Sequence, residues 1–268
     1  MDSFRWYQRL FLKSSFRKKR KRLIQRLLET HGYNNYQSDE VSGEEYLIGT
    51  VLASIDPELC VDVGANVGKY SRKILSWTNA RVIAFEPQPG LVKNLESLAK
   101  SFPERMQIVA NGVGKEPGTL TLRFNEAATE HASFVQSINE ISYVDNFNTV
   151  DVSVVTLDHF FGARPDLQQV DLLKIDTEGF EEEVLQGAKN TIARLRPKLI
   201  QFEYNQHQML RGHSVYSLTR HAPDYILFQL LPNSLERRDP LDPLANVYMF
   251  SNFVLIRPDV LKNLPLSE

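Results

Sequence analysis

The chain has 268 residues, enough for one large domain with an extension. No run approaches the roughly 18 apolar residues that a membrane span needs. The basic N-terminus lacks the uninterrupted apolar stretch of a secretory signal, so none is expected. The one cysteine, Cys60, excludes an intrachain disulfide and a zinc site built from several cysteines. We expect it to be a buried core thiol in a reducing, cytoplasmic environment.

Positive charge is concentrated at the N-terminus. The chain has a formal net charge of −2, yet residues 1–30 carry ten Lys and Arg against two acids and sum to +8. Apolar residues near helical spacing predict one or two helices over residues 3–29. Such a helix could lie on an anionic bilayer, bind a nucleic acid or an acidic partner, or pack on the body with a solvated basic face.

A domain boundary is expected just after this basic segment. Residues 31–43 have the polar composition of a linker, and residues 44–54 predict a helix that covers the sheet. We therefore divide the chain into a basic helical extension with its linker, residues 1–40, and a main domain, residues 41–268.

A glycine turn follows the first buried strand of the main domain, predicted over residues 59–63. Cys60, Val61 and Val63 are apolar and mostly β-favouring, and Gly64 and Gly68 follow where the strand turns into a helix predicted over 68–77. A strand, a glycine turn and a helix N-terminus form a cofactor-binding corner in α/β folds. The spacing G-A-N-V-G lacks the second glycine of the G-x-G-x-x-G loop, which admits a pyrophosphate.

An acid follows the second predicted strand. Residues 81–86 read as a strand that ends in Glu86, followed by Pro87. A carboxylate at that point is placed to accept hydrogen bonds from both ribose hydroxyls of a nucleoside. A nucleoside cofactor without a pyrophosphate suggests S-adenosylmethionine (SAM).

From residue 59 onward strands and helices alternate, which predicts an α/β fold with a mostly parallel sheet and helices on both faces. The exception is a β-rich insert, in which two segments alternate as strands do on either side of the irregular segment 125–149. The last two strands, separated by a loop without a clear helix, suggest an antiparallel hairpin at the sheet edge. Strands are predicted at 106–110, 119–124, 150–155, 170–175, 198–204, 225–231 and 251–256, and helices at 89–100, 180–195 and 214–221.

Five segments between about residues 59 and 257 have the residues and spacing of a known enzyme family. They are VDVGANVGKYS (61–71), VIAFEPQP (82–89), NGVGKEPGTLTL (111–122), VTLDHF (155–160) and, most specific, VDLLKIDTEGFEEEVLQGA (170–188). Through these segments the chain resembles the FkbM family of SAM-dependent methyltransferases. The resemblance implies the class I methyltransferase (Rossmann-like) fold with a seven-stranded sheet. It also implies methyl transfer to oxygen, typically to a hydroxyl of a sugar, glycan or polyketide-type natural product.

The expected cofactor contacts lie at the ends of the first four parallel strands. Backbone groups of 64–68 can bind the methionine end of SAM, and residues 111–113 follow the third strand, where class I folds line the adenine. The predicted cofactor-binding residues are Asp62, Gly64, Ala65, Asn66, Gly68, Ser71, Glu86, Pro87, Asn111, Gly112, Val113 and Asp176.

Two acids at neighbouring strand ends are the main catalytic candidates. Asp176 ends the fourth parallel strand, at the edge where open α/β sheets bind ligands, and Glu203 ends the fifth. They could form a base with its orienting partner, or oxygen ligands for a divalent cation such as Mg²⁺. His131 in the insert and His207 after the fifth strand are the other base candidates, because imidazole accepts a proton near neutral pH.

Several neighbouring residues have competing interpretations. Lys174 lies in an otherwise buried strand and is expected to need an ion-pair partner. Glu178 is expected to cap the next helix, where the helix dipole would stabilise its charge. The insert is long enough to be a lid or acceptor-binding loop, and its aromatic residues could stack on a sugar ring or pack under the loop. These aromatic residues are Phe134, Tyr143 and Phe147.

Two other functions fit part of the sequence. A nicotinamide-dependent oxidoreductase also places an acid after the second strand, but the glycine spacing counts against it. A non-catalytic membrane- or polyanion-binding protein on a methyltransferase fold would use the basic extension alone. The body is acidic and lacks an amide clamp for base nitrogens, so no nucleic-acid substrate is expected. The sequence favours a cytoplasmic O-methyltransferase that contacts the inner membrane face peripherally if residues 1–30 bind lipid.

Overall fold

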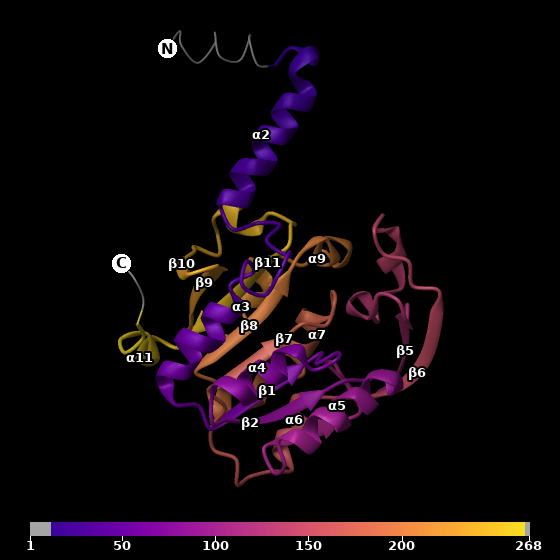
Figure 1. Cartoon of the computed structure of the whole chain (residues 1–268), viewed down its shortest axis with the longest axis vertical. Coiled ribbons are helices and arrows are strands. Elements are labelled where there is room, and N and C mark those ends of the chain that lie inside the picture. Colours follow the sequence, from indigo (N-terminus) through magenta and orange to yellow (C-terminus); the bar gives the residue numbers. More distant parts are fainter. Residues whose placement is uncertain (1–11, 266–268) are drawn as a thin grey trace.

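The computed structural model describes residues 12–265 and is built around an eight-stranded sheet (Figure 1). Its strand order is β10-β9-β11-β8-β7-β1-β2-β3. The parallel part consists of β1 (Leu59–Val63), β2 (Arg81–Phe85), β3 (Met106–Val109), β7 (Leu172–Ile175) and β8 (Leu199–Tyr204). The mostly parallel sheet and its helices confirm the predicted Rossmann-like class I fold.

The antiparallel edge differs from the prediction in its details. β11 (Ser251–Ile256) lies between β8 and β9 (Ile226–Leu231) and is antiparallel to both, so it is buried along its whole length. The loop expected after β9 contains β10 (Ser234–Arg237), which pairs with β9 and forms the outer hairpin. This extra strand makes the sheet eight-stranded rather than seven-stranded.

Helices cover both faces of the sheet because alternate strand residues point to opposite sides. One face, with Val61 and Val63 of β1, packs against α6 (Leu157–Gly162), α7 (Glu181–Gln186), α8 (Lys189–Leu195) and α10 (Val215–Thr219). The other face, with Cys60, packs against η2 (Leu47–Leu52), α4 (Lys69–Trp77) and α5 (Pro89–Ser101). Cys60 is a buried free thiol, as predicted.

Two expected helices are divided. The helix predicted over 180–195 is interrupted between α7 and α8 at Gly187, where an added Cβ would lie 2.1 Å from the carbonyl oxygen of Gly114. The helix predicted over 44–54 consists of α3 (Glu44–Tyr46), the π-helix η2 and the 3₁₀-helix η3 (Ala53–Ile55). The remaining short C-terminal elements are α9 (Gln206–Arg211), η6 (Pro243–Asn246) and α11 (Pro258–Leu261).

The β-rich insert forms a second sheet beside the first. β5 (Gly118–Phe124) and β6 (Asn148–Val155) are antiparallel, as the alternating pattern predicts, and β4 (Gly112–Val113) pairs with β6. The segment between β5 and β6 contains the 3₁₀-helices η4 (Thr129–His131) and η5 (Gln136–Glu140). Figure 1 shows the insert standing to one side of the carboxyl ends of β7 and β8.

The N-terminal part divides into a projecting helix and a packed segment. After η1 (Ser14–Phe16), helix α2 (Arg17–Thr30) extends away from the body (Figure 1); the first part of the predicted helix, residues 3–11, lies outside the described residues. The linker expected over 31–43 is instead packed on the sheet. Tyr33 is fully buried, and the carbonyl of Gly32 accepts hydrogen bonds from Gln229 and Ser251.

None of the helices within residues 12–265 is long and apolar enough to cross a membrane.

Candidate active site

A cavity of about 740 Å³ opens at the carboxyl ends of the central parallel strands. Its floor is formed where β1, β2, β7 and β8 end, and its walls come from the insert and from the N-terminal segment 34–44. Most of the predicted site residues therefore share one cavity. They are Gly64, Asn66, Glu86, Pro87, Asn111, Gly112, Val113, His131, Asp176, Glu203 and His207.

Four predicted cofactor residues lie behind the cavity wall: Asp62, Ala65, Gly68 and Ser71. Asp62 is fully buried and accepts a hydrogen bond of 2.6 Å from the Ser71 hydroxyl. Gly68 has a φ of +82° at the start of α4, and an added Cβ would lie 2.8 Å from Leu95. These residues hold the turn and its helix in place and do not face the cavity.

The glycine turn is tied to the ends of two neighbouring strands. The backbone N–H groups of Gly64 and Ala65 both donate to the carbonyl of Phe85 at the end of β2. Gly64 has a φ of +82°, and an added Cβ would lie only 1.8 Å from the carbonyl oxygen of Asp176. Both the backbone angle and the close approach to the end of β7 require glycine at this position.

Glu86 is held rigidly with its carboxylate at the cavity. One oxygen accepts the Asn66 N–H and the other accepts the Gln88 N–H, each at 2.8 Å. Burial raises the pKa of Glu86 to about 7. Because each carboxylate oxygen can accept more than one hydrogen bond, both retain capacity for donors that enter the cavity.

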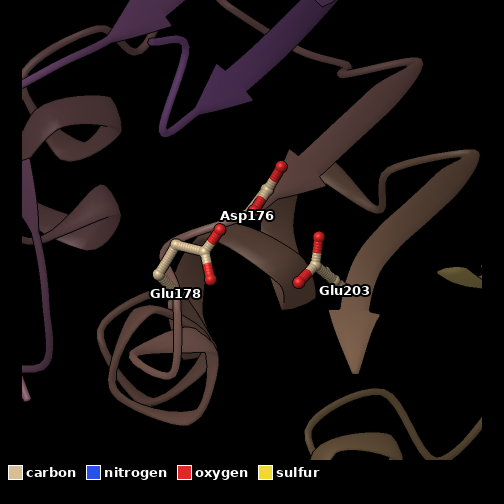
Figure 2. A group of neighbouring side chains, drawn as sticks. All are labelled: Asp176, Glu178 and Glu203. Carbon is tan, nitrogen blue, oxygen red and sulfur yellow. The ribbon is translucent and has the colours of Figure 1, made fainter. Parts of the chain in front are cut away.

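Three carboxylates gather on the cavity floor (Figure 2). Asp176 and Glu203 come from the ends of β7 and β8, and Glu178 comes from the loop between β7 and α7; each offers an oxygen within 4.8 Å of the others. The expectation that Glu178 caps the next helix is wrong. That helix begins at Glu181, which itself accepts the N–H groups of Thr177 and Gly179.

Burial and mutual repulsion act on these acids. Burial raises the pKa values of Glu178 and Glu203 well above the ordinary range, and the nearby charge of Asp176 raises both further. Three ionised carboxylates this close are stable only if protons or cations compensate them. Protonation of Glu178 or Glu203 relieves this repulsion, as the raised pKa values of both groups express.

Lys174 supplies part of that compensation. Its ammonium lies 3.1 Å from Asp176 and 3.3 Å from Asp62, so the predicted ion pair is confirmed. Burial alone would lower the pKa of Lys174, but the surrounding carboxylates outweigh it and raise the pKa above its ordinary value. The charged lysine thereby holds the Asp176 carboxylate in place through this ion pair.

His207 forms a pair with Glu178 at the same place. Its Nδ1 lies 2.7 Å from a Glu178 oxygen, and its Nε2 lies 3.5 Å from the Tyr143 hydroxyl. Burial lowers the pKa of His207, which favours a neutral imidazole at pH 7. Burial also lowers the pKa of His131, whose ring lies 5.6 Å from that of Tyr143 across the insert.

The sequence interpretation did not identify the N-terminal wall of the cavity. Polar composition suggested a linker, and the sign of packing was that Tyr33, Tyr36 and Val41 interrupt the polar residues. Glu44 accepts a hydrogen bond from Gln201, and burial raises its pKa to about 7. The lining residues from this segment are Asn34, Tyr36, Ser38, Asp39, Ser42 and Glu44.

Two of the three insert aromatics face the cavity. Phe134 and Tyr143 line it, whereas Phe147 is 69% exposed and is not part of its lining. On the opposite side, Tyr36 makes an edge contact with Phe250 at 6.0 Å, and both also line the cavity. The cavity thus has aromatic rings on two sides above an acidic floor.

Several solved structures resemble this chain weakly. A precorrin-6Y C5,15-methyltransferase from Geobacter metallireducens GS-15 matches at 13% identity with a TM-score of 0.40, covering 75% of this chain and 81% of that one. A fibrillarin from Aeropyrum pernix in complex with SAM matches at 10% identity with a TM-score of 0.43, covering 83% and 76%.

Comparison of sequences gives the family. "Methyltransferase 1" from Beauveria bassiana (strain ARSEF 2860) is 27% identical over 146 residues. The match covers 49% of this chain and 59% of that relative, so the chain spans less than two thirds of the relative's length. The model of the methyltransferase FkbM domain matches residues 62–230, which is more than half of the sequence and includes the strand ends that form the cavity floor. The chain therefore belongs to the FkbM methyltransferase family.

Proposed function

We propose that this protein transfers the methyl group of SAM to a hydroxyl of a sugar, glycan or polyketide-type acceptor. The observation that carries the proposal is the Glu178–His207 pair, which lies in the same cavity as the glycine turn and Glu86. Methylation of a hydroxyl releases a proton, so a base within reach of the acceptor is the group that such a reaction requires.

The residues around the glycine turn fit SAM. Glu86 faces the cavity with a carboxylate whose position is fixed by two backbone N–H groups, so it can accept both ribose hydroxyls. Gly112, Val113 and Phe134 form an adjoining, largely apolar surface for the adenine. Bound there, SAM would supply the electrophilic methyl group.

The Glu178–His207 pair is arranged as a general base. His207 Nδ1 lies 2.7 Å from the Glu178 carboxylate, and Nε2 lies 3.5 Å from the Tyr143 hydroxyl at the cavity. A neutral imidazole there can accept the proton of an acceptor hydroxyl at Nε2. Asp176, held by Lys174, can orient the acceptor or the ammonium of the cofactor. Positioned proton transfer of this kind contributes about 10²- to 10⁴-fold to a rate.

The rest of the cavity supports a cyclic, hydroxylated acceptor. Aromatic rings of Tyr36, from the N-terminal segment, and Tyr143, from the insert, line the cavity together with the polar side chains of Asn34, Ser38 and Asp39. Aromatic faces stack on the apolar faces of sugar rings, while polar groups bind their hydroxyls.

The test is incubation with isotopically labelled SAM and a panel of glycans and natural products, analysed by mass spectrometry. We expect label on an acceptor oxygen, and we expect His207→Gln to lower kcat by about 10²-fold or more while leaving SAM affinity unchanged. His221→Gln is the matched control, because His221 also contacts a glutamate at 2.7 Å, Glu182, but does not line the cavity. Label on nitrogen or carbon, or full activity in His207→Gln, would contradict the proposal.

The acidic cluster also suits a divalent cation. Asp176, Glu178 and Glu203 would hold Mg²⁺ through carboxylate oxygens, and the ion would polarise the acceptor hydroxyl. Activity that disappears with EDTA and returns with Mg²⁺ would assign the cluster to metal binding. Activity that is unchanged by EDTA would exclude a required metal ion and leave proton transfer by His207, beside Glu178, as the function of this part of the cavity.

A further inference from the structure

Helix α2 carries an unusual concentration of positive charge. Seven of the 14 residues in Arg17–Thr30 are Lys or Arg, against the single acid Glu29. None of its residues is buried, and the helix extends away from the body (Figure 1). Like charges at neighbouring helix positions repel and destabilise the helix. A helix as exposed and basic as α2 is therefore stabilised by a partner that neutralises its charge.

The same helix presents aliphatic side chains along one face. Leu23, Ile24, Leu27 and Leu28 follow the spacing i, i+1, i+4, i+5, which places them together on a helix. Leu28 packs against the core of the body, whereas Leu23, Ile24 and Leu27 are 49%, 55% and 59% exposed. Helical periodicity places four of the seven basic residues on the opposite side, Lys18, Lys19, Arg22 and Arg26, and the other three in the two turns before Leu23.

We propose that α2 docks on an anionic lipid bilayer. Leu23, Ile24 and Leu27 enter the boundary between headgroups and acyl chains, and the basic side chains lie among the lipid phosphates. A nucleic acid would engage the cations but would leave the aliphatic face in water. A second copy of α2 could cover the aliphatic face, but would bring two strongly basic helices together.

Docking would also place the cavity near the membrane surface. The segment that follows α2 is packed on the sheet at Gly32 and Tyr33, and it lines the cavity from Asn34 onward. The chain between the helix and the cavity wall is thus short and fixed. An acceptor anchored in the bilayer would then be within reach; this consequence rests on the proposed function, whereas the docking itself does not.

The experiment is sedimentation of the full chain with vesicles of phosphatidylcholine, with and without phosphatidylserine, at low and high salt. We expect binding only to the vesicles with phosphatidylserine, and loss of that binding at high salt. Two variants separate the contributions of the two faces, and a third, with four exposed cations changed elsewhere, is the control. They are Leu23→Ser/Ile24→Ser/Leu27→Ser, Lys18→Gln/Lys19→Gln/Arg22→Gln/Arg26→Gln, and Lys93→Gln/Lys100→Gln/Lys189→Gln/Arg220→Gln.

The two α2 variants should each lower vesicle partitioning by about 10-fold or more, and the control should bind like the unchanged protein. All three should unfold at the temperature of the unchanged protein, because the altered side chains are exposed. Failure of the full chain to sediment with the anionic vesicles at low salt would overturn the proposal. Normal vesicle binding by the serine variant would also overturn it. Binding of an RNA oligonucleotide in place of the vesicles would do the same, as would a dimer that the α2 variants dissociate and the control does not. None of these outcomes depends on methyl transfer.

Discussion

At the scale of single residues, Glu86 is a carboxylate whose orientation at the cavity is fixed by the backbone. Two backbone N–H groups fix the orientation of the carboxylate. One of them belongs to Asn66 in the glycine turn, so the position of Glu86 is tied to the end of β1. The cost of burying the acid is visible in its pKa, which burial raises to about 7. A hydrogen-bonding group kept in so poor an environment for charge is typical of a binding site.

We expect Glu86→Ala to weaken SAM binding by about 10²-fold or more, because each hydrogen bond to a charged group is worth about 1.5–3 kcal/mol. Isothermal titration calorimetry measures the change. Glu96→Ala, at an exposed acid of α5, should bind SAM like the unchanged protein. Equal affinity in both variants would remove Glu86 from the cofactor site.

At the scale of elements, the turn between β1 and α4 determines how closely two strands approach at the cavity floor. The positive φ of Gly64 and the nearby carbonyl of Asp176 leave no space for a side chain. Any larger residue would push apart the ends of β1 and β7, which carry the turn and the first acid of the cluster.

We therefore expect Gly64→Ala to lower the free energy of unfolding by about 2 kcal/mol or more, through backbone strain and the forced shift of β7. Gly90→Ala is the matched control. Gly90 lies near the start of α5 with nothing within 4 Å of an added Cβ, so alanine there should be neutral or stabilise by up to about 1 kcal/mol. Urea denaturation of both variants checks the difference; similar stabilities would contradict the close approach.

At the scale of the whole molecule, acids buried around one cavity make stability depend on pH. Burial raises the pKa of Glu44, like that of Glu86, to about 7. The folded state then binds the proton more tightly than the unfolded chain does. The resulting stabilisation is fully present below about pH 4.5 and is lost as pH rises through about 7.

Glu44→Gln isolates one such group. Gln can keep the contacts with Gln201 and Ser42 without a charge to bury. We expect equal stability of variant and unchanged protein near pH 4.5, and a variant that is more stable by about 1–3 kcal/mol at pH 8. Urea denaturation across this range measures the difference, with Glu40→Gln at an exposed position as control. A difference that does not change with pH would show that Glu44 ionises normally.

The sequence by itself determined the parts of the molecule that depend on local pattern. Buried strands followed by helices predicted the order of the elements, and G-A-N-V-G, Glu86 and Asp176 marked strand ends that meet in a parallel sheet. The motif of residues 170–188 indicated the family, because residue types and their spacing can be read directly from the sequence. Periodicity and spacing are readable here because neighbouring residues interact within one element.

Only the tertiary structure decided the contacts between distant segments. The pairing of Glu178 with His207, the packing of Tyr33 on the sheet and the insertion of β11 between β8 and β9 all join residues far apart in the chain. A polar segment such as 34–44 looks like a linker in sequence, because nothing local reveals that its side chains will line a cavity. Burial at the cavity also sets the pKa values of its acids, since desolvation depends on everything that surrounds a group and not on its own neighbours in sequence.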